Sequence, residues 1–500
     1  MKKLNLLFIG ILSVSALNAQ DISDALRYSQ DEIQGTARFR ALSGAFGALG
    51  GDMSAVSINP ASSAVFAQSH ASFTLSNVDT NNDTQYFNGF TTSSESNFDI
   101  SQGGASFVFE NRSNSPWRKF TIGVAYDRSN NYDDNWRAQG IGNTSIDRYF
   151  LAITEDIEVP FGTLKLQPNE FLEEAYADIG TIPEVGYMFQ QVFLGYWGGI
   201  IDPVNTDDDT NNDNIDYVSI LNGAPFNQTY IYNSTGYNGK ISFNMASQYE
   251  DNLYLGLNLN SHFIDYQRSN FFSENNDVEF GNNLSTRGNG FSFQLGGIIK
   301  LSPEFRLGLT YDSSTWYTIE EETTQSITSL EADPDTVYIK DILNVYPQYK
   351  LQTPSKLTGS LAYVFGTQGL LSFDYSRKDY SKTKFKSNSG IDFSNPNSNI
   401  SNTLTDASTY RLGGEYKVKQ FSFRGGYRFE ESPYKDGTTV GDLTGYSLGV
   451  GYNFGNTKLD VTFDQSNRTN ETPLYNVGLT DAAVIDRTNS NVTLSLSFNI

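Results

Sequence analysis

The chain has 500 residues, a formal net charge of −23, no cysteine and two histidines. Such an acidic chain lacks the basic surface that nucleic-acid phosphates require. His70 and His262 are far apart in the sequence, which disfavours zinc or haem ligation by these residues. No serine, histidine and acid combination has a spacing that indicates catalysis, so we expect neither an enzyme nor a cofactor.

The first residues are typical of an export signal. Lys2 and Lys3 precede an apolar stretch over 4–17, and cleavage fits after Ala19. The stretch is too short to cross a membrane as a helix, and no later segment reaches the roughly 18 to 20 apolar residues that a spanning helix needs. We expect residues 1–19 to be a signal peptide and any membrane span to consist of strands.

Residues 20–69 form a distinct segment without the alternating pattern that follows. We predict a short helix around 22–29, and the segment also contains a stretch rich in glycine and alanine and the sequence Asn59-Pro60-Ala61. Its glycines include Gly44, Gly47, Gly50 and Gly51. They superficially resemble a phosphate loop, but the G-x-G-x-x-G spacing and a preceding buried strand are missing. Small residues would instead let the segment pack closely inside a barrel, so we predict a hatch, or plug.

From residue 70 onward the sequence predicts β-strands. In 240–249 the apolar residues Ile241, Phe243 and Met245 alternate with polar ones. The fourteen candidate strands are 70–78, 97–110, 119–133, 237–249, 253–270, 289–301, 305–325, 349–366, 369–387, 406–418, 421–432, 442–455, 457–467 and 490–500. Their connections are alternately short and long, as in bacterial outer-membrane barrels. We predict an all-β fold, a 14-stranded antiparallel transmembrane β-barrel over 70–500 with the hatch in its lumen.

The longest predicted loop spans about 134–236 and should form an extracellular cap. Its sequence predicts a helix over 169–178 and contains an acidic run over 207–214. Four residues of the run have the alternate spacing of a calcium loop: Asp207, Asp209, Asn211 and Asp213. The glycine at position six and the glutamate at position twelve of such a loop are missing, so a solvated acidic loop is favoured over a calcium site.

Three stretches resemble the FadL-like family of outer-membrane long-chain fatty acid and hydrocarbon transporters. The first is residues 37–48 followed by Asn59-Pro60-Ala61, which is similar to the family's hatch segment. The second is residues 351–356 with the strand 371–380. The third is similar to the family's C-terminal hairpin and comprises residues 410–416, 423–427 and 431–433. The three occur in the family's order and span nearly the whole mature chain.

The resemblance implies a monomeric barrel in the outer membrane, plugged by its N-terminal hatch. It also implies passive uptake of hydrophobic compounds such as long-chain fatty acids, with capture in an extracellular groove and hatch-gated release. In the family the compound leaves through the lumen or sideways through a gap near the third strand, which is here about 120–133. Arg268 lies near the strand that carries a carboxylate-binding residue in the family, which makes it our candidate for that role. The expected partners are hydrophobic small molecules and membrane lipid.

Three other functions stay open at this point. Relatives of this fold serve as outer-membrane components of protein secretion or surface assembly, and the long loop could dock a partner. A haem-uptake receptor is a second alternative, although an energised receptor would carry a plug longer than 20–69. A general diffusion porin is disfavoured because the same segment should block the lumen.

Overall fold

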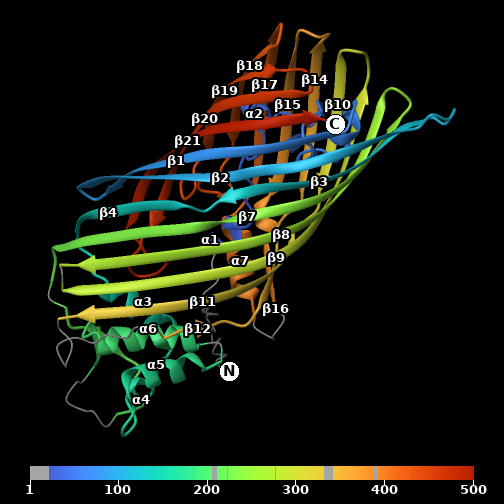
Figure 1. Cartoon of the computed structure of the whole chain (residues 1–500). Helices are drawn as coiled ribbons and strands as arrows, with labels where there is room; N and C mark the ends of the chain where they lie inside the picture. The colour runs from blue at the N-terminus through green and yellow to red at the C-terminus, as the bar shows by residue number, and fades with distance from the viewer. Residues whose placement is uncertain are drawn as a thin grey trace, which may run out of the picture.

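The computed structural model describes residues 22–500 except 184, 205–210, 222, 276, 331–341 and 388–391. Figure 1 shows a barrel of long strands, with helices inside it and at one of its ends. The predicted signal peptide, residues 1–19, lies outside the described residues. Among those residues, no helix is both long enough and apolar enough to cross a membrane.

The helices are α1 (Ile22–Arg27), α2 (Ala37–Ala41), α3 (Asp147–Asp156), α4 (Phe161–Leu164), α5 (Leu172–Gly180), α6 (Gly186–Trp197) and α7 (Ser394–Thr403), with the 3-10 helices η1 (Ser54–Ser57), η2 (Pro60–Val65) and η3 (Tyr380–Lys382). The strands are β1 (His70–Tyr86), β2 (Gly89–Glu110), β3 (Trp117–Asn131), β4 (Asp134–Gly142), β5 (Ile201–Pro203), β6 (Tyr217–Ser219), β7 (Phe226–Tyr249), β8 (Leu253–Glu274), β9 (Val278–Lys300), β10 (Phe305–Asp312), β11 (Trp316–Ser329), β12 (Asn344–Val345), β13 (Tyr349–Gln352), β14 (Lys356–Phe365), β15 (Gly369–Asp379), β16 (Lys384–Ser387), β17 (Asp406–Val418), β18 (Phe421–Glu430), β19 (Leu443–Asn453), β20 (Thr457–Pro473) and β21 (Ala482–Asn499).

The main sheet closes on itself, because β1 pairs antiparallel with both β2 and β21. The wall of the barrel consists of fourteen antiparallel segments, which we call staves. Several staves consist of two strands in line with a short irregular stretch between them. These composite staves are β3 with β4, β10 with β11, β13 with β14, and β15 with β16. The structure confirms the predicted 14-stranded antiparallel barrel with an N-terminal hatch region.

The alternating pattern places apolar side chains outside and polar side chains inside. On β8, Leu255 and Leu259 are exposed on the outer surface, whereas Asn258 and Asn260 are buried toward the lumen. This is the reverse of a soluble fold and fits a band of lipid around the barrel. A closed ladder also satisfies the backbone groups that lipid cannot.

The strands continue further beyond the apolar band than the sequence predicts. β1 runs to Tyr86 and β2 begins at Gly89, so the expected loop over 79–96 is a hairpin with a two-residue turn. This extension is rich in asparagine, aspartate, serine and threonine, since its outer face meets water. Asparagine and aspartate are depleted in ordinary strands, which is why the pattern there reads as a loop.

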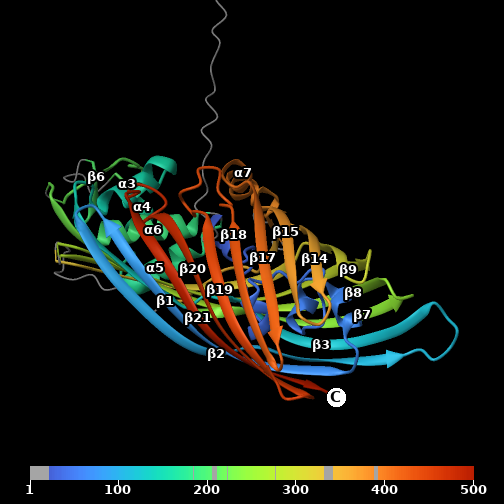
Figure 2. The ribbon, with the colours of Figure 1, turned by 90° about the horizontal axis from the view of Figure 1, so that it is seen from above.

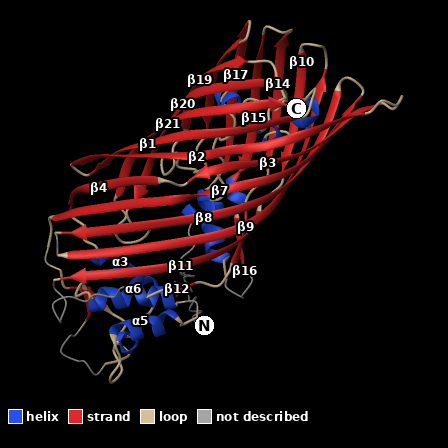
Figure 3. Cartoon of the chain, viewed as in Figure 1, coloured by secondary structure: helices blue, strands red, loops and turns tan. Residues whose placement is uncertain are grey.

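The long connection between β4 and β7 folds into a helical cap at one end of the barrel (Figures 1 and 3). The predicted loop over 134–236 is strand at both of its ends, because β4 covers 134–142 and β7 starts at Phe226. Helix α5 lies close to the predicted helix over 169–178. The cap shares an apolar core with the extended strands, whose large members include Phe150, Phe193 and Leu194 from the cap and Phe272, Phe280 and Ile327 from the strands.

Residues 22–66 lie inside the barrel, and Figure 2 shows this segment enclosed by the strands. Most of its residues are buried, including all of Pro60 to Ala64. We use the name hatch for residues 22–66 from here on.

Candidate functional site in the lumen and wall of the barrel

Asn59 joins two parts of the hatch to the barrel wall. Its Nδ2 donates hydrogen bonds to the carbonyl oxygens of Gly47, 2.7 Å away, and of Gly297 on β9, 3.1 Å away. Its Oδ1 accepts from the main-chain N–H of Ala61 and caps η2. The wall is glycine here, since a Cβ at Gly256 would lie 2.3 Å from the hatch main chain. The Asn59-Pro60-Ala61 sequence therefore fixes the hatch against β8 and β9.

Three of the four predicted hatch glycines need the conformational freedom of glycine. Gly44, Gly50 and Gly51 have φ angles of +76°, +66° and +69°, in the left-handed region. Gly47 instead meets the wall, where a Cβ would lie 2.0 Å from the Ser360 Oγ. The Gly47 N–H donates to the Asp374 carboxylate on β15 at 2.9 Å. The glycine stretch is thus a series of tight turns pressed against the wall.

Buried ion pairs hold helix α2 of the hatch to the wall. Arg38 Nε lies 2.9 Å from Glu415, and Arg40 Nε lies 2.7 Å from Asp464. Arg424 extends this network along the wall, because it contacts Glu415 at 2.6 Å. The lumen carries charges of both signs, and the hatch arginines complete their pairing. Breaking one such pair would leave an uncompensated buried charge, so these contacts resist removal of the whole hatch.

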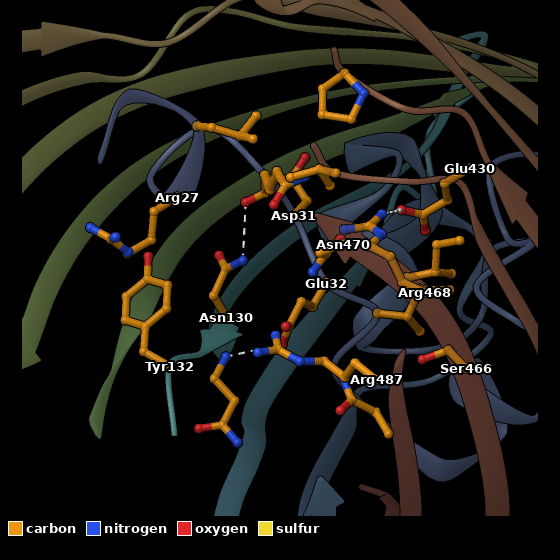
Figure 4. Close-up of a pocket in the computed structure, with 18 of the residues that line it drawn as sticks. Arg27, Asp31, Glu32, Asn130, Tyr132, Glu430, Ser466, Arg468, Asn470 and Arg487 are labelled. Carbon is orange, nitrogen blue, oxygen red and sulfur yellow. Dashed lines mark hydrogen bonds and ion pairs between the residues drawn. The ribbon is translucent and has the colours of Figure 1, made fainter. Parts of the chain in front are cut away.

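Two cavities in the lumen share a wall formed by the hatch segment 31–34. The larger, about 310 Å³, is lined mainly by charged and polar side chains (Figure 4). The smaller, about 120 Å³, extends to Arg128 on β3 and His262 on β8. Both cavities are lined by Asp31, Glu32, Ile33, Gln34, Lys356, Lys378 and Arg411. The segment 31–34 is therefore a partition within the lumen.

Ion pairs tie this partition to the barrel. The Asp31 carboxylate lies 2.9 Å from Lys356 Nζ and 3.3 Å from Lys378 Nζ. Partial loss of hydration inside the lumen would raise the pKa of this carboxyl, but the two ammonium groups outweigh that effect and hold the pKa well below its usual range. Arg411 lines both cavities, and its buried Nε has no hydrogen-bond partner in the described part of the chain. An anion in either cavity would meet the same cationic groups that hold Asp31.

On its other side the partition is bonded to the third stave. The Glu32 N–H donates to the Ser129 carbonyl at 3.2 Å, and the Glu32 carboxylate accepts from the Asn131 N–H at 3.0 Å. The Asn130 side chain donates to the Gln30 carbonyl at 3.1 Å. Figure 4 shows Asp31, Glu32 and Asn130 beside one another at this contact. We call residues 30–32 the latch, because they connect the luminal lysines to the third stave.

The third stave is also where the wall loses its backbone pairing. β2 pairs with β3 only over 102–110. The rest of β2, residues 89–101, pairs with β1 alone, and β4 follows a break at 132–133 and pairs only with β7. We call the unpaired line between residues 89–101 and β4 the seam; every residue along it is described.

Side chains bridge the seam in place of a ladder. The crossing contacts between side chains include those of Arg128 with Asp99, Asn97 with Asp133, and Asn135 with Glu95. Hydrogen bonds between a side chain and the main chain add to them, from Thr91 to the Arg137 carbonyl and from the Ile141 N–H to Asn88. Beside them, Phe98 and Ile100 are exposed on the outer face of β2, which places this end of the seam next to the lipid-facing band. The seam can therefore open by breaking side-chain contacts while every β-ladder stays intact.

Comparison with known proteins decides the family. Residues 240–499, more than half of the chain, match the model of the family described as outer membrane protein transport protein (OMPP1/FadL/TodX). The chain belongs to this family. Comparison with curated protein sequences finds no match. As a member of the OMPP1/FadL/TodX family with a closed barrel, the protein is an integral β-barrel of the outer membrane.

Several solved structures share the fold of this chain. A FadL homologue from Pseudomonas aeruginosa has a TM-score of 0.55 and 12% identity, over 94% of this chain and 99% of that one. The toluene transporter TodX from Pseudomonas putida has a TM-score of 0.53 and 12% identity, over 94% and 100%. The CymD monoaromatic hydrocarbon channel has a TM-score of 0.50 and 13% identity, over 93% and 97%. At such low identity these likenesses show the fold alone.

Arg268 is the residue that the sequence suggested for binding a ligand carboxylate. It lies on β8 and lines neither luminal cavity. Its Nε is buried without a hydrogen-bond partner among the described residues. Lys356, Lys378 and Arg411, which the sequence did not single out as ligand residues, line both cavities instead. A ligand role for Arg268 stays a prediction.

The weak calcium candidate lies partly outside the described residues, which leave out Asp207 and Asp209. Asn211 and Asp213 are exposed on the cap. In the described ranges, no group of three or more histidine, aspartate or glutamate side chains is arranged to hold a metal ion.

Proposed function

We propose that this protein carries hydrophobic compounds with an anionic head group, such as long-chain fatty acids, passively across the outer membrane. The observation that carries the proposal is the latch, which binds the luminal lysines on one side and the third stave beside the seam on the other. Relatives named as a toluene transporter and a monoaromatic hydrocarbon channel support the hydrophobic class. The lysines around Asp31 support an anionic head group.

Such uptake needs no energy source. Moving a hydrocarbon chain out of water is favourable by about 0.8 kcal/mol per methylene, so capture in an extracellular groove and passage into lipid are both downhill. The direct path to the periplasm is obstructed by the hatch, which buried ion pairs from Arg38 and Arg40 hold in place. The seam is the weaker barrier, because side-chain contacts stand there in place of a backbone ladder.

The hatch acts as the gate through its latch. A ligand carboxylate in the larger cavity competes with the Asp31 carboxylate for Lys356 and Lys378, and Arg411 beside them adds a further cation. Once Asp31 is displaced, residues 30–32 lose their hold on the luminal side and release the stretch 129–131. The third stave can then move away from β2, and the compound leaves sideways through the seam.

The proposal is tested by locking the seam with cysteines, since the chain has none of its own. Asn97→Cys with Asp133→Cys joins two residues whose side chains are in contact across the seam. Closing this pair with a short bis-maleimide or by oxidation should reduce uptake of labelled oleate in cells by about tenfold. Reduction of the oxidised pair should restore uptake.

The matched control joins β2 to β3 below the seam. Phe109→Cys with Phe120→Cys links two outward residues that are already partners in the ladder. This closed pair should transport as well as the wild type. Unchanged oleate uptake by the closed Asn97–Asp133 pair would refute release through the seam.

A further inference from the structure

Three lysines share the outward face of the ribbon formed by β13 and β16. Lys350 on β13 is the register partner of Lys386 on β16, and Lys384 is the partner of Gln352. All three lysines are exposed, whereas Tyr349 and Phe385 point the other way into a buried core cluster. The lysines therefore form one compact patch on the outside of the barrel.

Ion pairs do not compensate the charge of this patch within the part of the chain that the structure describes. Residues directly opposite each other on antiparallel strands have Cβ atoms about 4.5–5.5 Å apart, and like charges there repel. Lys386 Nζ donates to Gln352 Oε1 at 2.6 Å, and none of the three lysines has an ion-pair partner among the described residues. Glu320 on β11 is exposed on the same outward face, but its carboxylate accepts a hydrogen bond from Gln348. The three lysines are therefore arranged to meet an external anion.

The register places the patch at the outer boundary of the lipid-facing band. Gln352 is the partner of Trp316 on β11, and Trp316 is the partner of Phe291 on β9. Trp316 and Phe291 are exposed aromatic residues at the end of the apolar stretch of their staves, and the next outward residues on β9 are Asn289 and Arg287. Exposed aromatic side chains of this kind mark the level of lipid head groups.

We propose that Lys350, Lys384 and Lys386 bind the phosphate groups of an outer-leaflet lipid, a phosphorylated glycolipid. The patch lies on the side of the long connections and the cap, which faces the cell exterior in outer-membrane barrels. Clusters of basic residues at a membrane surface attract anionic head groups. A bound phosphate would also remove the repulsion between Lys350 and Lys386.

The test uses the full-length protein in detergent and measures binding of diphosphorylated lipid A by native mass spectrometry. The variant is Lys350→Gln, Lys384→Gln, Lys386→Gln, which should bind lipid A about tenfold more weakly than the wild type. The control, Lys165→Gln, Lys419→Gln, Lys435→Gln, removes the same charge elsewhere and should bind like the wild type. Replacing the three patch lysines by arginine should preserve binding.

Thermal unfolding gives a second, independent readout. Without phosphorylated lipid the glutamine variant should be at least as stable as the wild type, because the repulsion is gone. With lipid A the order should reverse. Equal binding of lipid A by the wild type and the glutamine variant, or equal binding of dephosphorylated lipid A, would overturn the proposal. Full displacement of lipid A by millimolar inorganic phosphate would assign the patch to free phosphate and likewise overturn it.

Discussion

Asp31 pairs with the two lysines that, in the proposed function, receive the anion of a ligand. Its side chain is 48% exposed, so its ion pairs with Lys356 and Lys378 contribute modestly, of the order of 0.2–1 kcal/mol each. An incoming carboxylate can therefore replace Asp31 at a small cost in free energy. A tightly buried pair such as Arg40 with Asp464 could not be exchanged in this way.

Asp31→Asn should weaken the latch. Losing about 0.5–1 kcal/mol of ion pairing should raise the rate of oleate uptake roughly two- to fivefold and increase hydrogen exchange at residues 30–32. Asp156→Asn, an exposed change on the cap, is the matched control and should leave both measurements unchanged. Slower uptake by Asp31→Asn would show instead that Asp31 helps to bind the transported compound.

The pKa of Asp31 also predicts how uptake responds to pH. Because the folded-state pKa lies below the unfolded value, the stabilisation from this ion pair is present above about pH 4. It is lost only as the pH falls through the lower, folded value. We therefore expect Asp31 to stay ionised between about pH 5 and 8. Over this range, oleate uptake corrected for the ionisation of oleate should depend on pH in the same way in the wild type and in Asp31→Asn.

Among the elements, the contact between η2 and the wall depends on glycines in the strands. Gly256 on β8 lies so close to the hatch that a Cβ there would be 2.3 Å from main-chain atoms of Pro60 and Ala61. Gly359 on β14 lies on the outer face of the wall, and a Cβ added there would have no atom within 4 Å. The same substitution should therefore have different effects at the two sites.

Gly256→Val should displace the hatch and destabilise the protein by about 1–3 kcal/mol through overpacking. Planar-bilayer recordings should show a higher conductance than the wild type, because a displaced hatch no longer fills the lumen. Gly359→Val adds the same side chain on the lipid face and should keep the wild-type conductance and stability. Wild-type conductance in Gly256→Val would mean that the hatch adjusts without opening the lumen.

The sequence predicts the staves well only where they cross lipid. There, one apolar and one polar face impose a strict alternation, as in 240–249. The hairpin over 79–96 meets water outside and carries no apolar face, so the same signal is missing. The latch was not predictable, because its partners are distant in the sequence: Lys356 is 325 residues from Asp31, and Asn131 is 99 residues from Glu32.

At the scale of the whole molecule, the cap and the barrel share one apolar core, but the cap takes no part in the backbone hydrogen bonding between the strands of the barrel. Gly142 is the last residue of β4 and Phe226 is the first residue of β7, so they flank the cap, and they are register partners of each other. All fourteen staves are complete without residues 143–225. The cap is therefore an addition to a barrel that closes on its own.

Replacing residues 143–225 by a short glycine and serine turn should leave a folded barrel. Phe272 and Phe280 are changed to threonine in this variant, because removal of the cap would expose them to water. Unboiled samples of the variant should still migrate faster in gel electrophoresis than boiled samples, which is the mark of a closed barrel. The control is the full chain with the same two threonines. A cap-less variant that migrates as an unfolded chain would show that the cap is needed to close the barrel.

The hatch also has a consequence for how the protein is assembled. Ala37 donates its N–H to the Ser495 Oγ at 2.7 Å, across 458 positions of the sequence, and Arg40 is paired with Asp464 on β20. The part of the described chain that is exported first thus receives its partners from the strands that arrive last. Contacts so distant in sequence form late. The hatch can therefore make these two contacts only after β20 and β21 have been exported, so the plug cannot be fully seated by the N-terminal half of the chain alone.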